Sequence, residues 1–133
     1  MRSYDTGMDG DRLWTAPAEY VVVGRRWTYA PPPRVMYEAI VNDVDQWLSP
    51  QTGESAPRVA ASRRPDAVLL KPWVDAAVTA VELRIEQHGN GAAITVLAYG
   101  DVPQLPDETR RRVRHRLGTI FGAALRYWVD EPR

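Results

Sequence analysis

Several residue types are scarce in this sequence of 133 residues, which has no cysteine, one phenylalanine and two histidines. Without cysteine the chain cannot form a disulfide bond, a thiolate nucleophile or a zinc site built on sulfur. His88 and His115 are not spaced four residues apart, as paired metal ligands on one helix would be. We therefore expect no metal site and no cofactor.

An excess of either charge is also lacking, because 17 basic and 17 acidic residues give a net charge of zero. This balance gives no electrostatic reason to expect nucleic acid or an anionic membrane as a partner. The opening residues MRSYDTGMDGDRLW lack the apolar core of a secretory signal. No apolar run approaches the roughly 18 residues of a membrane span. We therefore expect a cytoplasmic protein without a membrane span.

The composition predicts one globular domain, with 44% hydrophobic and 26% charged residues. Residues 1–18 are polar and show no sustained hydrophobic period, which predicts a flexible N-terminal tail. Met8, Leu13 and Trp14 are the tail residues that could dock on the body of the protein. Residues 19–131 are expected to form the domain.

A run of three prolines, residues 31–33, separates two segments of different character. Residues 19–30 are rich in β-branched and aromatic side chains and predict a strand. Proline fixes φ and lacks an N–H, so the strand must end near Ala30, while the last proline suits the first turn of a helix. Val35, Ala39 and Ile40, with Met36 behind them, repeat at helical spacing. A polyproline ligand for another domain is the alternative, but an apolar helix follows at once.

The rest of the chain alternates between strand-like and helical patterns. Asn42 or Asp43 can cap a second short helix that ends at Leu48. Strands are expected at residues 58–62, 67–73, 78–86 and 92–100, with a hairpin turn at 88–91. Within 78–86 the residues alternate strictly, which predicts one buried face (Thr79, Val81, Leu83, Ile85) and one solvated face (Ala80, Glu82, Arg84, Glu86). One long amphipathic helix is expected from Pro106 to about Asp130.

"TYAPPPRV" followed by a helix and "NDVDQWLSP" resembles the opening of START-like (SRPBCC) domains. The nearest branches are those of the chaperone-ATPase activators and the polyketide cyclases. The matching positions here are Ala30-Pro31, Val35, Asp43 and Trp47. "PDAVLLKPW", "VELRIEQHGNGAAITV" and a terminal helix with Gly118 follow in the order of the family, over about residues 19–131.

The resemblance implies an α+β helix-grip fold. In that fold a curved antiparallel sheet of about five to six strands wraps around a long C-terminal helix, and two short helices follow the first strand. A cavity between sheet and helix often takes a small hydrophobic molecule. The Gly-Trp pair of the chaperone-activator branch is not evident in the last helix. No catalytic set carries over, because the catalytic residues differ among members.

Candidate cavity residues follow from this resemblance together with the strand and helix patterns. They are Arg26, Thr28, Trp47, Trp73, Val81, Leu83, Ile94, Val96, Arg110, Val113, Leu117, Phe121 and Trp128. In the register of the family, Arg26 points inward and could hold a ligand carboxylate. The opposite face of that strand, with Val21, Val23, Trp27 and Tyr29, is more apolar, so the sequence leaves both orientations open.

Two arginine features have simpler explanations beside the functional ones. Arg110 could stand at the cavity mouth or extend its head to solvent from the first turn of the helix. "RRRVRHR" at residues 110–116 resembles a nucleic-acid patch, but helical geometry turns Val113 inward and leaves Arg111 and His115 outside. A solvated helix face accounts for this pattern.

The sequence predicts a protein that binds a small hydrophobic or aromatic molecule without altering it. The alternatives are an enzyme of the polyketide cyclase type and a protein-interaction module without an open cavity. The expected inward strand positions contain no Asp, Glu or His, which counts against catalysis. The sequence is also compatible with a homodimer.

Overall fold

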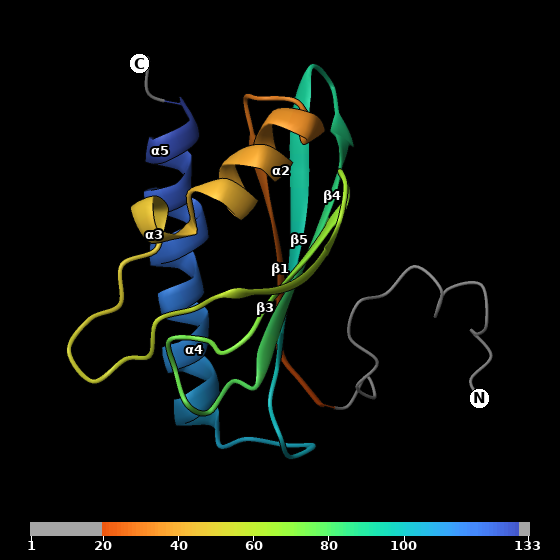
Figure 1. The fold of residues 1–133 in the computed structure, drawn as a ribbon. Coiled ribbons are helices and arrows are strands. Elements are labelled where there is room, and N and C mark those ends of the chain that lie inside the picture. The colour runs from red at the N-terminus through yellow and green to blue at the C-terminus, as the bar shows by residue number, and fades with distance from the viewer. Residues whose placement is uncertain (1–19, 131–133) are drawn as a thin grey trace.

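The computed structural model of this chain describes residues 20–130, so the predicted tail at residues 1–18 lies outside the described residues. A curved sheet lies on one side and the helices lie on the other, with the C-terminal helix running along the sheet (Figure 1). The elements in chain order are β1 (Val21–Tyr29), α2 (Pro33–Asn42), α3 (Val44–Trp47), β2 (Val59–Arg63), β3 (Ala67–Leu70), β4 (Ala80–His88), β5 (Gly91–Tyr99), α4 (Asp107–Thr119), η2 (Ile120–Ala124) and α5 (Leu125–Asp130).

The sheet has five strands in the order β1-β5-β4-β3-β2, and every neighbouring pair is antiparallel. Consecutive strands pair from β2 to β5, as expected for local hairpins. β1 instead joins the far side of β5, so the first and last strands of the chain lie side by side. This arrangement confirms the predicted α+β class and brings the start of the domain next to the C-terminal helix.

The three prolines form the predicted corner between β1 and α2. Pro32 is the extended N-cap residue, Pro33 occupies the first turn, and the Met36 amide donates to the Pro32 carbonyl at 3.0 Å. The buried residues of α2 are Met36, Tyr37 and Ile40, whereas Val35 is 49% exposed. The prediction that Val35 leads the apolar stripe was therefore wrong, because Met36 and Ile40 lie four residues apart on the buried face.

The predicted strand at residues 67–73 ends early, at Leu70. Pro72 lacks an N–H and cannot continue the ladder, so the chain leaves the sheet. Trp73 consequently lies outside the strand and is buried, with 1% of its surface exposed. Because β3 ends at Leu70, the direction of the Trp73 side chain is not set by the alternation of a strand.

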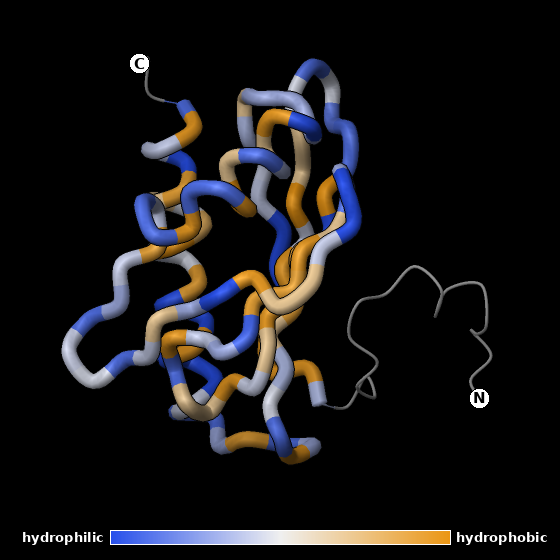
Figure 2. The backbone as a smooth tube through the Cα atoms, viewed as in Figure 1, coloured by the Kyte–Doolittle hydropathy of each residue, from blue (hydrophilic) through white to orange (hydrophobic). Residues whose placement is uncertain are grey.

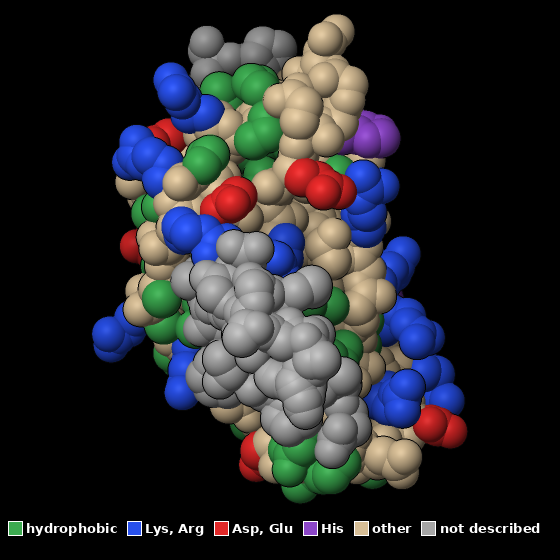
Figure 3. All heavy atoms as spheres, turned by 90° about the vertical axis from the view of Figure 1, so that its right-hand side faces the viewer, with side chains coloured by type: hydrophobic (Ala, Val, Ile, Leu, Met, Phe, Trp, Pro, Cys, Tyr) green, Lys and Arg blue, Asp and Glu red, His purple; other side chains and the backbone are tan. Residues whose placement is uncertain are grey.

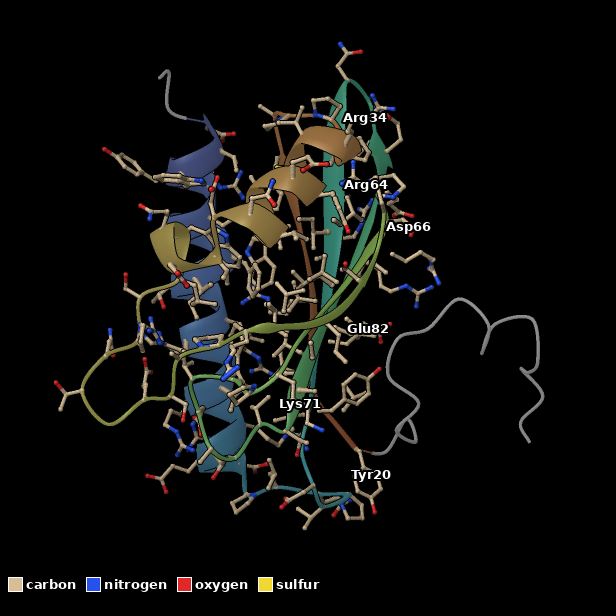
Figure 4. The ribbon with its side chains drawn as sticks, in the orientation of Figure 1. Tyr20, Arg34, Arg64, Asp66, Lys71 and Glu82 are labelled. Carbon is tan, nitrogen blue, oxygen red and sulfur yellow. The ribbon has the colours of Figure 1, made fainter. Side chains whose placement is uncertain are left out.

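The outer face of β4 differs from the prediction of a solvated surface. Glu86 is exposed, but Ala80 and Glu82 are fully buried. Figure 4 shows Glu82 on the side of the sheet that faces away from the C-terminal helix. Its cross-strand neighbours are Leu69 and Leu97, and the Tyr99 hydroxyl lies 3.5 Å from one of its carboxylate oxygens.

The turn between β4 and β5 requires glycine at two positions. Gly89 has φ +58°, a backbone conformation that favours glycine at the first central position of a tight hairpin. At Gly91 a Cβ would collide with the backbone carbonyl of Tyr29 on the neighbouring strand β1. The predicted hairpin at residues 88–91 is confirmed by the register, in which His88 pairs with Gly91.

The hydrophobic residues of the middle strands lie together along the sheet (Figure 2). On the inner face they pack against the C-terminal helix, whose buried residues are Val113, Leu117, Ile120, Phe121 and Leu125. The predicted helix from 106 to 130 is present, but it contains one wide π-helical segment, η2. There the Leu125 amide donates to the Ile120 carbonyl, five residues back.

Candidate functional site

Four aromatic rings meet between the sheet and the C-terminal helix, and we name this group the aromatic centre. Phe121, in η2, lies at its middle and is fully buried. The ring of Trp73 is nearly parallel to it, with a centroid distance of 6.1 Å. Trp27 and Trp47 each lie 5.8 Å from it, at interplanar angles of 29° and 53°. The space expected for a ligand is thus occupied by rings with offset and tilted contacts.

Gly122 lets the helix approach β1 closely at the same point. A Cβ at this residue would lie 3.1 Å from the indole nitrogen of Trp27. One residue earlier, the Tyr29 hydroxyl donates to the Phe121 carbonyl at 2.6 Å, in a buried setting. Burial raises the pKa of Tyr29 well above its ordinary range, and the nearby Arg126 lowers it in part. The hydroxyl therefore stays protonated and serves as a donor that anchors η2 to β1.

A surface groove of about 400 Å³ adjoins the aromatic centre between α3 and the C-terminal helix. Its walls are Gln46, Trp47, Ser49, Arg116, Ile120, Ala124, Tyr127 and Trp128. Trp47 belongs to both features, so the groove and the aromatic centre share this residue. Tyr127 is 69% exposed and stands at the outside. The volume is within the range of about 300–1,000 Å³ that small-molecule sites commonly have.

Trp47 brings a buried hydrogen-bond donor to the groove wall. The indole nitrogen of Trp47 is buried and has no hydrogen-bond acceptor among the residues that the structure describes. The whole Trp47 side chain is almost inaccessible, with 3% of its surface exposed. A buried donor without an acceptor costs about 1–3 kcal/mol, so such groups are uncommon away from functional sites.

The charge at one end of the groove is neutralised internally. Arg116 makes two hydrogen bonds to the Glu54 carboxylate, at 2.7 and 2.9 Å, and a third to the Ser49 carbonyl at 3.1 Å. Both side chains of this ion pair are less than one fifth exposed. The hydrogen bonds from Arg116 hold the pKa of Glu54 below its ordinary value, although burial opposes them. The loop that carries Glu54 is thereby fixed to α4.

A second ion pair closes the neighbouring loop over the same helix. Arg112 donates to both carboxylate oxygens of Asp75, at 2.8 and 3.1 Å. This bond lowers the pKa of Asp75 and raises that of Arg112. Together with His115, these residues border a hollow of about 470 Å³. Two arginines of "RRRVRHR" thus bind carboxylates of this chain, which fits the expectation of an ordinary helix face.

Most of the predicted cavity residues do meet in the interior. Trp47, Trp73 and Phe121 belong to the aromatic centre, and Trp128 lines the groove. Six aliphatic candidates are buried around them: Val81, Leu83, Ile94, Val96, Val113 and Leu117. Whether any of them contacts a ligand stays a prediction.

Arg26 and Thr28 lie on the outer face of β1, contrary to the orientation expected from the register of the family. Arg26 pairs with Glu86 at 3.2 Å, and their side chains are 48% and 63% exposed. Figure 3 views the molecule from the sheet side, where Lys and Arg side chains are spread over the visible surface. The apolar residues decide the orientation, because Trp27 and Tyr29 occupy the inner face.

Arg110 is exposed in the first turn of α4, as expected for the solvent-directed alternative. Trp27 is missing from the predicted site, although the alternation of β1 carried the signal for its inward position.

Within residues 20–130, no three His, Asp or Glu side chains gather as metal ligands. None of the helices there is both long and apolar enough to cross a membrane.

The chain matches no protein-family model and no curated protein. Solved structures share its fold at low sequence identity. CalU16 from Micromonospora echinospora has a TM-score of 0.59 and 16% identity, covering 80% of this chain and 72% of its own. DynU16, encoded in the dynemicin biosynthetic locus, has a TM-score of 0.59 and 19% identity, covering 80% of this chain. This chain spans only 46% of DynU16.

A third structure extends the comparison beyond these two proteins. The Aha1 dimer from Colwellia psychrerythraea has a TM-score of 0.55 and 12% identity, covering 77% of this chain and 92% of its own. The TM-scores of these three structures support a shared fold despite the low sequence identity. The chain therefore adopts a helix-grip fold, in which a five-stranded antiparallel sheet curves around the long C-terminal helix.

Proposed function

We propose that this protein binds a small hydrophobic or aromatic molecule beside the aromatic centre and does not alter it chemically. The observation that carries this proposal is the buried indole N–H of Trp47, a residue shared by the groove and the aromatic centre, which has no acceptor among residues 20–130. Flat aromatic walls and a groove of about 400 Å³ suit a planar ligand. A deeper cavity would require the rings around Phe121 to move apart.

Catalysis is less well supported than binding. The inner positions of β4 and β5 are aliphatic, and Tyr29 is a titratable group in direct contact with Phe121. Its hydroxyl already donates a hydrogen bond and its pKa is raised, so it is a poor general base. No observation favours the polyketide cyclase alternative.

An interaction module would be favoured by a continuous exposed apolar patch. The large exposed hydrophobic residues within 20–130 are Val35, Val102 and Tyr127. They lie in α2, in the segment between β5 and α4, and in α5, respectively. Because they belong to three separate elements, they provide no observation for that alternative.

Native mass spectrometry of the purified protein, followed by denaturing extraction, tests the proposal directly. We expect a co-purifying apolar molecule of defined mass, and the same spectrum tests whether the protein forms a homodimer. Protein stripped of this molecule should then bind a neutral naphthalene probe, followed by tryptophan fluorescence, with saturation at one site per chain. Absence of saturable binding to the stripped protein would refute the proposal.

A matched pair of variants locates the site. Ala124 lines the groove, whereas its neighbour Ala123 is exposed. Ala124→Phe should fill the groove and weaken binding by at least about ten-fold, equivalent to about 1.4 kcal/mol. Ala123→Phe makes the same change on the solvent side and should leave the affinity unchanged. Equal effects of the two substitutions would place the ligand elsewhere.

A further inference from the structure

We infer that the groove selects a neutral ligand with one hydrogen-bond acceptor oxygen, such as an aryl ketone, and that the Trp47 indole N–H binds this oxygen. This inference rests on the proposed function and names its ligand class. Three features support it: the Trp47 N–H has no acceptor among residues 20–130, Arg116 is paired with Glu54, and aromatic side chains line the groove.

The indole N–H of Trp47 is a buried hydrogen-bond donor. Trp47 is 97% removed from solvent, yet its Nε1 has no acceptor within residues 20–130. An indole N–H can only donate, so the site calls for an acceptor atom on the ligand. A ligand oxygen there would recover the desolvation penalty already present in the empty state, and this recovery favours ligands that carry one.

The positive charge of Arg116 is already paired with the Glu54 carboxylate. Arg116 is the cationic side chain in the groove wall, and it already donates to Glu54, Ser49 and Thr119. An anionic ligand would have to compete with the Glu54 carboxylate, which holds Arg116 through two hydrogen bonds. Without that competition, burial of an anion beside the indoles is strongly unfavourable. The groove is therefore suited to an uncharged molecule.

A ligand can reach the buried N–H of Trp47 only if the short helix that carries it moves. α3 is a single turn of four residues, and a helix this short is not stable by itself. It lies beside α5 (Figure 1) and ends at Trp47. A small shift of α3 would therefore open the groove wall at this ring. On the opposite wall, Ile120 and Ala124 mark the two ends of η2. π-Helical turns occur frequently at functional sites.

The test uses three naphthalene probes of nearly the same shape. 2-Acetylnaphthalene carries a neutral acceptor oxygen, 2-isopropenylnaphthalene replaces it with a methylene group, and 2-naphthoate is anionic. We expect the ketone to bind about five-fold more tightly than the hydrocarbon, the effect of a hydrogen bond of about 1 kcal/mol. The anion should bind more weakly than either.

Trp47→Phe keeps an aromatic ring and removes the N–H. In this variant the affinity ratio between ketone and hydrocarbon should fall to about one. Trp73→Phe makes the same change on another ring of the aromatic centre and should preserve the ratio. In native protein, the ketone should also shift one indole N–H resonance downfield, which requires no variant to fold.

The binding results distinguish a failure of this inference from a failure of the proposed function. Equal binding of ketone and hydrocarbon by the native protein, or an unchanged ratio in Trp47→Phe, would overturn the inference and leave the proposed function intact. Tightest binding of 2-naphthoate would overturn it as well, because Arg116 would then be available to anions. Binding of none of the probes would refute the proposed function and the inference together.

Discussion

Replacement of Tyr29 by phenylalanine tests whether the sheet anchors the π-helical segment through one hydrogen bond. The change removes the hydroxyl that donates to the Phe121 carbonyl at 2.6 Å. It keeps the ring, which is 4% exposed and lies 5.2 Å from the Arg126 guanidinium. The variant should lose this buried hydrogen bond to the Phe121 carbonyl, which lowers the free energy of unfolding by about 2 kcal/mol.

Urea denaturation followed by tryptophan fluorescence measures this change, since the indoles surround Phe121. The melting temperature should fall by roughly 8 °C, because about 1 kcal/mol corresponds to roughly 4 °C for a domain of this size. Tyr37→Phe is the matched control. Its hydroxyl bonds to the Ser62 hydroxyl at 2.9 Å in a partly buried position, where water can replace it, so a loss of about 0.5 kcal/mol is expected.

A loss below about 0.5 kcal/mol in Tyr29→Phe would refute this reasoning, because the Phe121 carbonyl would then have another acceptable partner. A loss equal to that of Tyr37→Phe would have the same meaning. An altered denaturant slope would instead show that the unfolded or native state had changed in compactness.

Three other predictions concern backbone space, pH and surface charge. Gly91→Ala should destabilise the fold by more than about 3 kcal/mol in urea denaturation, because its Cβ meets the Tyr29 carbonyl. Gly118→Ala, in open space on α4, should stabilise it by about 0.5–1 kcal/mol, and the opposite order would contradict the register. Because Arg116 lowers the pKa of Glu54 in the folded state, its contribution is present above the unfolded pKa and is lost as pH falls through the lower folded pKa. Stability measured from pH 6 to pH 3 should therefore fall less in Glu54→Gln than in the native protein, and parallel curves would disprove the coupling. Arg26→Gln should change stability by less than about 0.5 kcal/mol and leave probe affinity unchanged, whereas weaker probe binding would return Arg26 to the ligand site.

Local chemistry made the main elements predictable. Three consecutive prolines end a strand, and the apolar helical repeat that follows them predicts a helix start, which the structure places with Pro33 in the first turn of α2. The hairpin at Gly89 and the length of the C-terminal helix follow in the same way from turn chemistry and helical period.

Site residues were predictable only where burial decides the position. Trp47, Trp73 and Phe121 are large apolar residues, so their meeting in the interior follows from the fold that the resemblance implies. Arg26 was placed by the register of the family, yet Trp27 and Tyr29 offered more apolar surface to the core and set the opposite orientation. The early end of β3 at Leu70 depended on Pro72, whose missing N–H was present in the sequence but not given enough weight.

The class of fold, the order of its elements and the lack of cysteine chemistry were predictable from the sequence, because these depend on composition and on residues close together in the chain. The partner of each polar group, in contrast, depends on residues that are far apart in the chain. Long-range packing joins Arg116 to Glu54 and Tyr29 to the Phe121 carbonyl, and it leaves the Trp47 indole without an acceptor among residues 20–130. The same packing produces η2, where the helix approaches Trp27 through Gly122. Periodicity identifies the face of an element, but the side chain that it meets depends on how the sheet curves around the helix.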